Sequence, residues 1–446
     1  MKKVLIANRG EIALRILRAC RELGLKTVAV HSTADAEAKH VLLSDESVCI
    51  GPGPAKESYL NIQSILAAAE ITHADAIHPG FGFLSENVQF AQAVEDHNII
   101  FIGPVPEHIA QMGDKVEAKR TAQKLGIPIV PGSDGEVESV EAALKFANEA
   151  GYPVIVKAAS GGGGKGMQVA YSDQELKEKF PIARTEAKVN FGDDRVYIEK
   201  YLNNPRHIEF QVLGDGKGNA VHLGERDCSI QRRHQKIWEE APSPVITPEQ
   251  RNEVGEVVAS AMRMMKYRGL GTIEFLYENG KFYFIEMNTR IQVEHPITEM
   301  ITGIDLVHEQ IKIAAGHPLT LKQEDIKFKG HAIECRINAE DPETFAPSPG
   351  KVKHFHVAGG PGIRIDSGLY GGYVIPPYYD SMVAKLIVHA STRDKCLARV
   401  RRALPEFYVD GVKTNIPLHQ RLADDDDVKK GDYTIQWLEN KFLKKK

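Results

Sequence analysis

A run of glycines in the sequence has the composition of a phosphate-binding loop. Residues 160–167 read SGGGGKGM and follow 153–158, an apolar segment that is expected to form a buried strand. Glycine has no Cβ, so its backbone N–H groups can approach phosphate oxygens closely. The run is not a P-loop, because Met167 stands after Gly166 where the lysine and hydroxyl residue of that motif would be needed. A flexible linker has a similar composition, but Lys157 on the preceding strand favours phosphate binding.

A second stretch that could do chemistry is 286–294, which reads EMNTRIQVE. Polar residues occupy every second position: Glu286, Asn288, Arg290, Gln292 and Glu294. In an extended strand this period would place all five side chains on one face. A strand with one solvent-exposed face would have the same pattern. The stretch alone therefore does not decide between a site and a surface.

Glu274 favours a metal site, because it precedes an expected hairpin turn at Asn279-Gly280 and Glu286 follows it. A two-residue turn would place the two carboxylates on opposite faces, so a shared metal predicts a three-residue loop or a bulge. Two carboxylates and the amide oxygen of Asn288 are hard ligands suited to magnesium that bridges nucleotide phosphates. This combination indicates a phosphoryl-transfer site, in which lysines and arginines would neutralise further negative charge.

The first part of the chain alternates segments that read as strands and helices. Residues 3–7 and 27–31 are short apolar segments, and 11–23 has apolar residues at helical spacing. A strand-helix-strand order is typical of a parallel sheet. The alternation continues to about residue 110, which predicts one doubly wound unit.

Beyond residue 114 the pattern changes to helices, breakers and strand-rich segments. Region 196–295 alternates short strands with turns, and strands and turns recur beyond Gly330. Helical spacing returns at 393–404 and 414–422. The fold class is therefore expected to be α/β and α+β, with several domains.

Composition narrows the function classes. A net charge of -4 among 446 residues suggests neither a nucleic-acid partner nor a disordered chain. The N-terminus does not fit a signal peptide and no apolar run is long enough to span a bilayer, so the expected location is the cytoplasm, without membrane contact. Five dispersed cysteines, with no CxxC pair, argue against a zinc site or a disulfide framework, and each is expected to be buried.

Many segments resemble the biotin carboxylase family, from one end of the chain to the other. They include ANRGEIALRI at 7–16, HPGFGFLSEN at 78–87, the glycine run, EKYL at 199–202, RHIEFQVLGD at 206–215, ERDCSIQRRHQKIWEEAP at 225–242, EMNTRIQVEHPITE at 286–299, AIECRINAEDP and PPYYDSMVAKL. Their number and order make chance agreement implausible.

The resemblance implies a homodimeric ATP-grasp enzyme of three domains. These would be an N-terminal doubly wound parallel-sheet domain over 1–113, a central ATP-grasp domain over 114–329 with a mobile lid at about 130–203, and a mainly antiparallel C-terminal domain over 330–446. Residues that match ATP-binding positions are Lys115, Lys157, Gly163, Gly164, Glu199, Lys200, Tyr201, Leu202, His207, Gln231, His234, Glu274 and Glu286. The two lysines would hold phosphates, and residues 199–202 would line the adenine pocket.

The resemblance also implies roles in the reaction. Metal ligands for Mg²⁺ or Mn²⁺ would be Glu274, Glu286 and Asn288, and bicarbonate would bind at Lys236, Arg290, Gln292, Val293 and Glu294. The catalytic residues would be Lys236, Arg290, Glu294 and Arg336. Glu294 would remove the bicarbonate proton, and Arg290 would bind both bicarbonate and carboxyphosphate. Arg336 would bind biotin and stabilise negative charge on its ureido oxygen; without the motif it would be assigned a surface ion pair with Glu334 or Glu340.

Three positions depart from the commoner pattern of the family. Phe81 stands where tyrosine is frequent, Ser160 replaces a glycine, and Lys165 stands where arginine is usual. A hydroxyl contact at Phe81 is therefore not expected, and the glycine loop would be slightly stiffer but would keep its cation.

Two rival functions share some of these features. Another ATP-grasp ligase, which forms carbamoyl phosphate or carboxylates a purine precursor, would share the lysines, glycines and metal ligands, but RRHQK and RIQVEHP argue against it. A catalytically silent nucleotide-binding module would not need Glu274, Glu286, Arg290 and Glu294 together.

The expected substrates are ATP, bicarbonate and biotin on a biotin carboxyl carrier protein. The chain contains no MKM biotin-attachment motif and ends at Lys446, so it is expected to act with separate carrier and carboxyltransferase subunits. Acetyl-CoA carboxylase, in fatty-acid synthesis, is the expected setting, and a two-subunit pyruvate or acyl-CoA carboxylase is the alternative. Candidates for the homodimer surface by resemblance are Arg15, Arg18 and Glu22.

Overall fold

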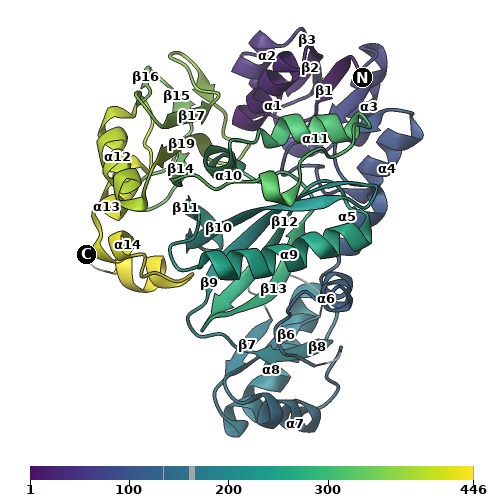
Figure 1. Ribbon diagram of the computed structural model, residues 1–446, viewed down its shortest axis with the longest axis vertical. Helices are drawn as coiled ribbons and strands as arrows, with labels where there is room; N and C mark the ends of the chain where they lie inside the picture. Colours follow the sequence, from purple (N-terminus) through teal and green to yellow (C-terminus); the bar gives the residue numbers. More distant parts are fainter. Residues whose placement is uncertain (134, 160–165, 445–446) are drawn as a thin grey trace. The chain divides into compact units, whose positions relative to one another are not determined.

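The computed structural model describes residues 1–133, 135–159 and 166–444. The chain divides into two compact units, whose elements are labelled in Figure 1. The first consists of Met1–Gly113, His207–Glu274 and Met287–Lys446, and the second of Asp114–Arg206 and Phe275–Glu286. The three-domain division given by the resemblance stays a prediction.

The first unit begins with a five-stranded sheet. Its strands are β1 (Lys3–Ile6), β2 (Lys26–Ser32), β3 (Glu46–Gly51), β4 (Ala76–His78) and β5 (Ile100–Phe101), in the order β3-β2-β1-β4-β5. All neighbouring strands are parallel, which confirms the doubly wound prediction. The intervening helical elements are α1 (Gly10–Glu22), η1 (Thr33–Asp35), α2 (Lys39–Leu43), η2 (Ala55–Glu57), α3 (Ile62–Ile71), α4 (Val88–Asp96) and α5 (Pro106–Gly113).

Local chemistry explains where these helices begin and which face they bury. Asn61 and Asn87 cap α3 and α4, because each side chain accepts a hydrogen bond from a backbone N–H of the first turn. In α1, Ile12 and Ile16 are buried at helical spacing and belong to one apolar cluster with Val4 of β1. Burial of these faces fixes the helices on the sheet.

A larger sheet of eight strands carries two of the four catalytic candidates, Lys236 and Arg336. Its order is β13-β12-β9-β10-β11-β14-β19-β17. The strands are β9 (Arg206–Asp215), β10 (Ala220–Arg232), β11 (Gln235–Ala241), β12 (Arg268–Glu278), β13 (Lys281–Asn288), β14 (His331–Asn338), β17 (Ile363–Ser367) and β19 (Met382–Ala390). Neighbouring strands from β9 to β17 are antiparallel. Because β11 pairs with β14, the C-terminal strands continue the sheet formed by β9, β10 and β11.

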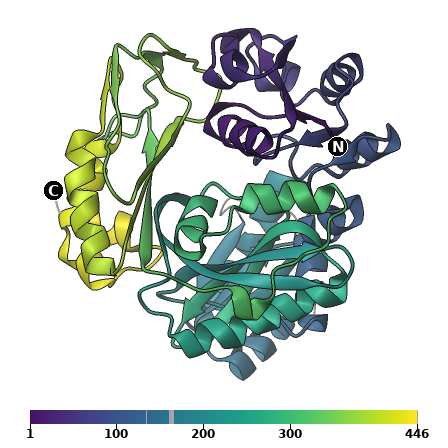
Figure 2. The ribbon, with the colours of Figure 1, turned by 45° about the horizontal axis from the view of Figure 1, so that its top comes forward.

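Helices cover this sheet, and smaller strands complete the C-terminal part. The helices are α9 (Pro248–Met265), α10 (His295–Thr302), α11 (Leu306–Ala314), η3 (Gln323–Asp325), α12 (Arg393–Glu406), α13 (Ile416–Asp424), α14 (Asp426–Lys430) and the π-helical turn η4 (Leu438–Phe442). The small strands are β15 (Gly350–Lys351), β16 (His354–His356), β18 (Val374–Ile375) and β20 (Tyr408–Asp410). Helix α12 packs on β14 and β19, and Figure 2 shows it in yellow-green beside these strands. The C-terminal antiparallel sheet is therefore confirmed.

The second unit has its own sheet and core. Strands β6 (Val154–Ala158), β7 (Met167–Ala170) and β8 (Val196–Lys200) form an antiparallel sheet in the order β7-β6-β8. The helices are α6 (Lys115–Lys124), α7 (Val140–Ala150) and α8 (Asp173–Phe191). Apolar side chains of α7, α8 and the sheet form one buried cluster, so the unit can hold its shape by its own packing. Mobility of this predicted lid stays a prediction.

The cysteines are mostly buried. Cys20, Cys228, Cys335 and Cys396 are buried as predicted, but Cys49, on the edge strand β3, is exposed. Within the described part of the chain, none of the helices combines the length and apolarity needed to cross a bilayer.

Candidate functional site

Lys236 joins three buried carboxylates in the first unit. From β11, its Nζ lies 2.6 Å from Glu209 Oε2, 3.0 Å from Glu274 Oε1 and 2.6 Å from Glu294 Oε1. Burial opposes a charge here, but Glu209 and Glu274 raise the pKa of Lys236 well above its ordinary value. The ammonium therefore stays charged and holds three acidic side chains around one point.

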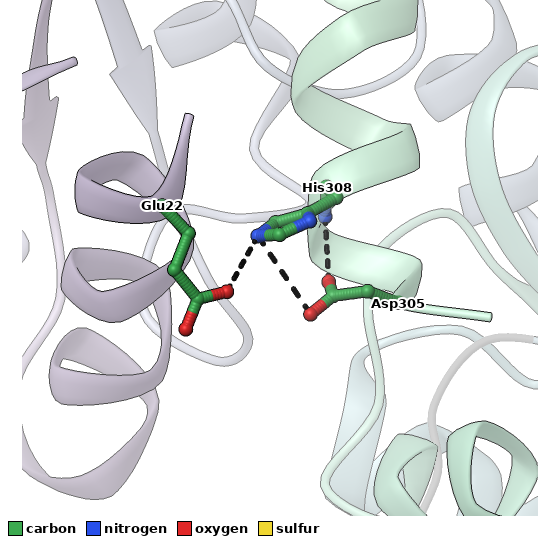
Figure 3. Close-up of side chains that lie close together, drawn as sticks. All are labelled: Glu22, Asp305 and His308. Atoms are coloured by element: carbon green, nitrogen blue, oxygen red, sulfur yellow. Dashed lines mark hydrogen bonds and ion pairs between the residues drawn. The ribbon is translucent and has the colours of Figure 1, made fainter. Parts of the chain in front are cut away.

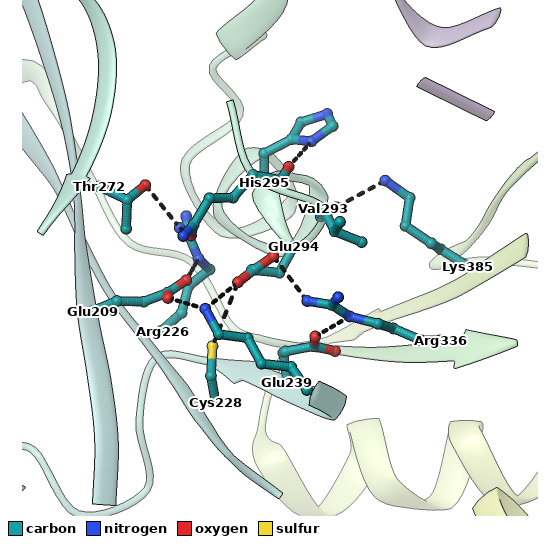
Figure 4. A network of polar contacts seen from close by, with 12 residues as sticks. Glu209, Arg226, Cys228, Glu239, Thr272, Val293, Glu294, His295, Arg336 and Lys385 are labelled. Atoms are coloured by element: carbon teal, nitrogen blue, oxygen red, sulfur yellow. Dashed lines mark hydrogen bonds and ion pairs between the residues drawn. The ribbon is translucent and has the colours of Figure 1, made fainter. Parts of the chain in front are cut away.

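A second cation, Arg226 on β10, is completely buried beside this group (Figure 4). Its Nε donates to Glu209 Oε1 at 2.6 Å, and its Nη2 donates to Gln292 Oε1 at 2.8 Å. Further acceptors of the same guanidinium are Gln211, Thr272 and Thr298. Burial raises the pKa of Glu209, but Lys236 and Arg226 lower it below the ordinary range. The hydrogen bond from Arg226 therefore fixes the side chain of Gln292, a predicted bicarbonate ligand.

Glu294 is the residue before α10 and not part of a strand. Strand β13 ends at Asn288, so the predicted extended strand over 286–294 is wrong beyond that residue. Pro296, near the start of α10, favours helix initiation, and His295 N donates to Gln292 O at 3.3 Å to close a turn. The period-two pattern was therefore misleading, because a turn followed by a helix interrupts it.

The turn nevertheless brings Glu294 into the charged cluster. Its Oε1 accepts from Lys236, and its Oε2 accepts from Arg336 Nη2 at 3.0 Å. Burial raises the pKa of Glu294, but Lys236 and Arg336 lower it below the ordinary value. The carboxylate is therefore ionised at neutral pH, as a general base must be before it accepts a proton.

Arg336 on β14 is held between two carboxylates. Its Nε donates to Glu239 Oε1 at 2.5 Å, in addition to the contact with Glu294. Burial opposes the charge, but Glu239 and Glu294 raise the pKa of Arg336 above its ordinary value. The guanidinium is thus not in the surface ion pair with Glu334 or Glu340 that would be its assignment without the motif.

Arg290 contacts Glu86 and Asn288. Its Nε lies 2.7 Å from Glu86 Oε2, and its Nη2 donates to Asn288 Oδ1 at 2.7 Å. Glu86, in the loop before α4, also accepts from Thr289 N at 3.0 Å. The Glu86 carboxylate therefore accepts hydrogen bonds from Thr289 and Arg290 and fixes the segment immediately after β13.

Glu274 and Asn288 lie in contact, as the predicted metal site requires. Glu274 Oε1 accepts from Asn288 Nδ2 at 2.9 Å and from Gln292 Nε2 at 2.7 Å, besides its contact with Lys236. The third predicted ligand, Glu286, lies on β13 within the part of that strand that belongs to the second unit.

The hairpin that carries these ligands differs in part from the prediction. Its turn contains two residues, Asn279 and Gly280, with φ of 52° and 80°, so the predicted three-residue loop is wrong. In a regular ladder from such a turn, Glu274 and Asn288 would point to opposite faces. Glu274 and Asn288 are nevertheless joined by a hydrogen bond. In β13, Ile285 is exposed while Phe284 and Met287 are buried, which breaks the regular alternation of a strand. Both observations indicate a bulge, the other possibility that the shared metal site predicted.

The donor set fits a magnesium or manganese ion, since carboxylate and amide oxygens are hard ligands. Burial raises the pKa of Glu274, but Lys236 and His207 lower it well below the ordinary range. The carboxylate thus stays ionised, and its oxygens, now bound to protein donors, have the charge that a divalent cation needs.

The predicted nucleotide contacts of the first unit occupy different environments. His207 Nε2 lies 2.9 Å from Glu274 Oε2. Burial lowers the pKa of His207, but the Glu274 carboxylate raises it to about 9, so the ring is charged at neutral pH. Gln231 is buried and donates to Cys228 O at 3.2 Å, whereas His234 is exposed in the turn between β10 and β11.

In the second unit, the predicted nucleotide residues gather at Glu199 on β8. Lys157 Nζ on the neighbouring β6 donates to Glu199 Oε2 at 2.6 Å, and Lys119 also donates to this carboxylate. Burial raises the pKa of Glu199, but Lys157 and Lys119 lower it below its ordinary value. Glu199 therefore holds Lys157 in a defined place.

Besides Glu286, the structure describes four other predicted residues of this unit. Lys200 Nζ donates to two backbone carbonyls, Gly151 O and Tyr152 O, both at 2.8 Å. Lys115 is exposed at the start of α6, and Leu202 is buried. Tyr201 N donates to Pro153 O at 3.0 Å. Gly163 and Gly164, with Ser160 and Lys165, lie outside the described residues.

Sequence reasoning missed four charged partners: Glu86, Glu209, Arg226 and Glu239. The alternation of polar and apolar residues in RHIEFQ could have identified Glu209, because it puts His207, Glu209 and Gln211 on one face of β9. For Arg226 and Glu239 no local pattern exists, since their partners come from other strands.

A separate group of polar side chains joins α1 to the start of α11 (Figure 3). His308 Nε2 lies 3.0 Å from Glu22 Oε2 and 3.8 Å from Asp305 Oδ2. Arg15, a candidate for the dimer surface, is buried and lies 2.7 Å from Asp305 Oδ1. Arg18 and Glu22, the other two candidates, are exposed.

Family models match almost the whole chain. The model described as biotin carboxylase, N-terminal domain, matches residues 1–109, and the biotin carboxylase C-terminal domain matches 334–440. Residues 114–322 match the carbamoyl-phosphate synthase L chain ATP binding domain. The three matches follow the order of the predicted motifs.

Known proteins of similar sequence and structure agree with these matches. The chain is 62% identical to a biotin carboxylase of Haemophilus influenzae and 60% identical to one of Pseudomonas aeruginosa, with 99% of both chains covered in each comparison. A biotin carboxylase domain of a thermophilic 2-oxoglutarate carboxylase, bound to bicarbonate, is similar with a TM-score of 0.94 and 50% identity. The comparison covers 98% of this chain and 97% of the other.

Two further solved structures are similar over the same extent, 98% of this chain and 97% of each neighbour. The Hydrogenobacter thermophilus 2-oxoglutarate carboxylase biotin carboxylase domain, a dimer with MgADP, ADP and bicarbonate, has a TM-score of 0.90 and 51% identity. A biotin carboxylase subunit of pyruvate carboxylase has a TM-score of 0.89 and 52% identity.

Proposed function

The chain belongs to the biotin carboxylase family of ATP-dependent ligases, and from this premise we propose that it uses ATP and bicarbonate to carboxylate biotin on a separate carrier protein. The observation that carries the proposal is the arrangement of Lys236, Glu294 and Arg336. A buried carboxylate lies between two cations, each within 3.0 Å. A base flanked by fixed positive charge suits a reaction in which an anionic nucleophile is formed and a second anion must then be stabilised.

In the first step, Glu294 removes the proton of bicarbonate, and the resulting oxygen nucleophile attacks the γ-phosphorus of ATP. The bond from that phosphorus to the β,γ-bridging oxygen breaks, which leaves ADP and carboxyphosphate. Lys236 is already bound to Glu294, and it would neutralise negative charge on bicarbonate. Arg290, held by Glu86 and Asn288, supplies a planar cation for the same anion.

In the second step, the bond between the carboxyl carbon and the phosphate oxygen of carboxyphosphate breaks, which releases carbon dioxide and inorganic phosphate. The phosphate takes the proton of the biotin ureido nitrogen, which leaves negative charge on the ureido oxygen, and the nitrogen then attacks the carbon of carbon dioxide. Arg336 is proposed to donate to this oxygen, because its guanidinium is fixed in orientation by Glu239 and Glu294. A preorganised cation stabilises such a charge without reorganisation during the reaction.

ATP is proposed to bind with magnesium or manganese, which would neutralise phosphate charge. Within the first unit, Glu274 and Asn288 would hold the metal, and His207, Gln231 and His234 would contact the nucleotide. Within the second unit, Glu286 would be a metal ligand, Lys115, Lys157, Gly163 and Gly164 would bind phosphates, and Glu199, Lys200, Tyr201 and Leu202 would bind adenine. The ion pairs of Glu274 with Lys236 and of Lys157 with Glu199 support these assignments.

The test is ADP release by the purified protein with ATP, Mg²⁺ and bicarbonate, with and without free biotin. We expect strong stimulation by biotin that also requires bicarbonate. ADP release that ignores biotin would indicate another ATP-grasp ligase, and bound ATP without turnover would indicate a silent module. Chelation of the metal should abolish the activity, and either Mg²⁺ or Mn²⁺ should restore it.

We further propose that the chain provides the biotin carboxylase activity of an acetyl-CoA carboxylase in the cytoplasm, as a homodimer. Exposed Arg18 and Glu22 support a dimer surface on α1, and a similar structure is a dimer. The alternative is a two-subunit pyruvate or acyl-CoA carboxylase, since the solved neighbours include domains of 2-oxoglutarate and pyruvate carboxylases.

Reconstitution separates these settings. The protein would be mixed with a biotinylated carrier and with carboxyltransferase subunits specific for acetyl-CoA or for pyruvate. Malonyl-CoA formation with the first set alone supports acetyl-CoA carboxylase, whereas oxaloacetate formation with the second set alone contradicts it.

A further inference from the structure

Lys385, on β19, is a completely buried lysine that contacts the turn before α10 (Figure 4). Its Nζ donates to the backbone carbonyl of Val293 at 2.8 Å. The same ammonium lies 3.1 Å from Glu11 Oε1 of α1 and 3.9 Å from Asp366 Oδ2 of β17. Lys385 thus joins the turn to two other elements of the first unit.

A lysine in this place needs a reason, because a buried ammonium is unfavourable unless charges and acceptors surround it. The charged groups around it are Glu11, Glu334, Asp366 and Arg364. An apolar residue of similar volume would pack without any of these partners. What the ammonium adds is a charge-assisted hydrogen bond to the Val293 carbonyl.

Three successive carbonyls of the turn are held, but only one of these bonds is long-range. Ile291 O accepts from Arg290 Nη1 at 3.3 Å, and Gln292 O accepts from His295 Nδ1 at 2.8 Å. Both donors are within three residues of their acceptors and move with the turn. The bond to Val293 O spans 92 residues of sequence and ties the turn to the sheet of β14, β19 and β17.

We infer that Lys385 is a positioning residue, which fixes the Val293 peptide and thereby the places of Gln292 and Glu294 at the bicarbonate site. This inference rests on the proposed function, since Val293 and its neighbours are bicarbonate ligands only there. A turn that shifts by about 1 Å can lower a rate by about a hundredfold, because the base and the bicarbonate cradle lose their alignment.

The test measures biotin-dependent ADP release by three variants. Two are the single substitutions Lys385→Met and Glu11→Gln, and the third is the double variant that combines them. The single Lys385→Met variant leaves Glu11 buried without its cation and can fail to fold for that reason. The double variant removes both groups of the pair and keeps Asp366 with Arg364, 2.8 Å away. Glu11→Gln alone is the matched control, because it keeps the bond to Val293.

We expect the double variant to raise the KM for bicarbonate, or lower kcat, by about ten- to hundredfold. Its KM for ATP and its melting temperature should stay close to those of Glu11→Gln, whose bicarbonate kinetics should resemble those of the wild type. Wild-type bicarbonate kinetics in the double variant would overturn the inference, as would a parallel loss for ATP and bicarbonate, which indicates a general structural role. Failure of the proposed function is distinct, because the wild type itself would then show no ADP release stimulated by biotin.

Discussion

The ammonium of Lys236 and the carboxylate of Glu294 form a buried ion pair, 2.6 Å between Nζ and Oε1. Two consequences follow for a general base in this position. The cation keeps Glu294 ionised, and it also opposes protonation of Glu294, so the proton taken from bicarbonate will be held weakly and passed on readily.

Replacement of Glu294 by Gln should abolish carboxylation and leave nucleotide binding intact. The amide keeps the shape of the side chain but cannot accept a proton, so kcat for biotin-dependent ADP release should fall by about 10²- to 10⁴-fold. Titration with ATP and Mg²⁺ by calorimetry is the control. Loss of ATP binding would contradict the role assigned to Glu294.

Replacement of Arg336 by Ala should also remove biotin carboxylation without loss of ATP binding. The variant lacks the cation proposed to stabilise the ureido oxyanion, and a loss of about 10²- to 10³-fold is expected. Arg336→Lys keeps the charge but not the planar fork, so partial activity is expected. Slow ADP release without biotin should be unaffected in both variants; an equal loss of the two activities would argue against a role specific to biotin.

Arg226→Met should destabilise the first unit. The substitution removes one cation from Glu209 and the donors to Gln211 Oε1 and Gln292 Oε1, and breaking a buried pair in this way costs about 3–5 kcal/mol. Arg402→Met, at an exposed pair with Glu406, is the matched control and should change stability by less than about 0.5 kcal/mol. Urea unfolding that gives similar midpoints for the two variants would show that the buried network contributes little.

Glu239 should make stability depend on pH. Burial, only partly offset by Arg336, raises its pKa from 4.5 to about 7. The folded protein therefore binds this proton more tightly than the unfolded chain, so the contribution to stability is present below pH 4.5 and is lost as the pH rises through about 7.

The variant Glu239→Gln lacks this proton and isolates its effect. Melting temperatures of the wild type should fall relative to those of Glu239→Gln between pH 4.5 and 7. Parallel curves for the two proteins over this range would show that Glu239 is already ionised in the folded state.

Several elements could be predicted from the sequence because local patterns determine them. Apolar spacing in 3–31 is enough for a strand, a helix and a second strand, which form β1, α1 and β2 of a parallel sheet. Sequence reasoning grouped Glu274 and Asn288 as metal ligands, and the structure joins them by a hydrogen bond, although a regular two-residue hairpin would place them on opposite faces. The segment 286–294 failed because period two is the same whether the chain continues as a strand or turns into a helix.

The sequence by itself determined the family, the parallel sheet and the residue types available for phosphoryl transfer. Tertiary structure decided which of these side chains meet. Lys236, Glu209 and Glu294 come from β11, β9 and the start of α10, and Arg336 is brought beside them because β14 pairs with β11. Contacts between strands so distant in sequence depend on sheet order and burial, which no local pattern encodes.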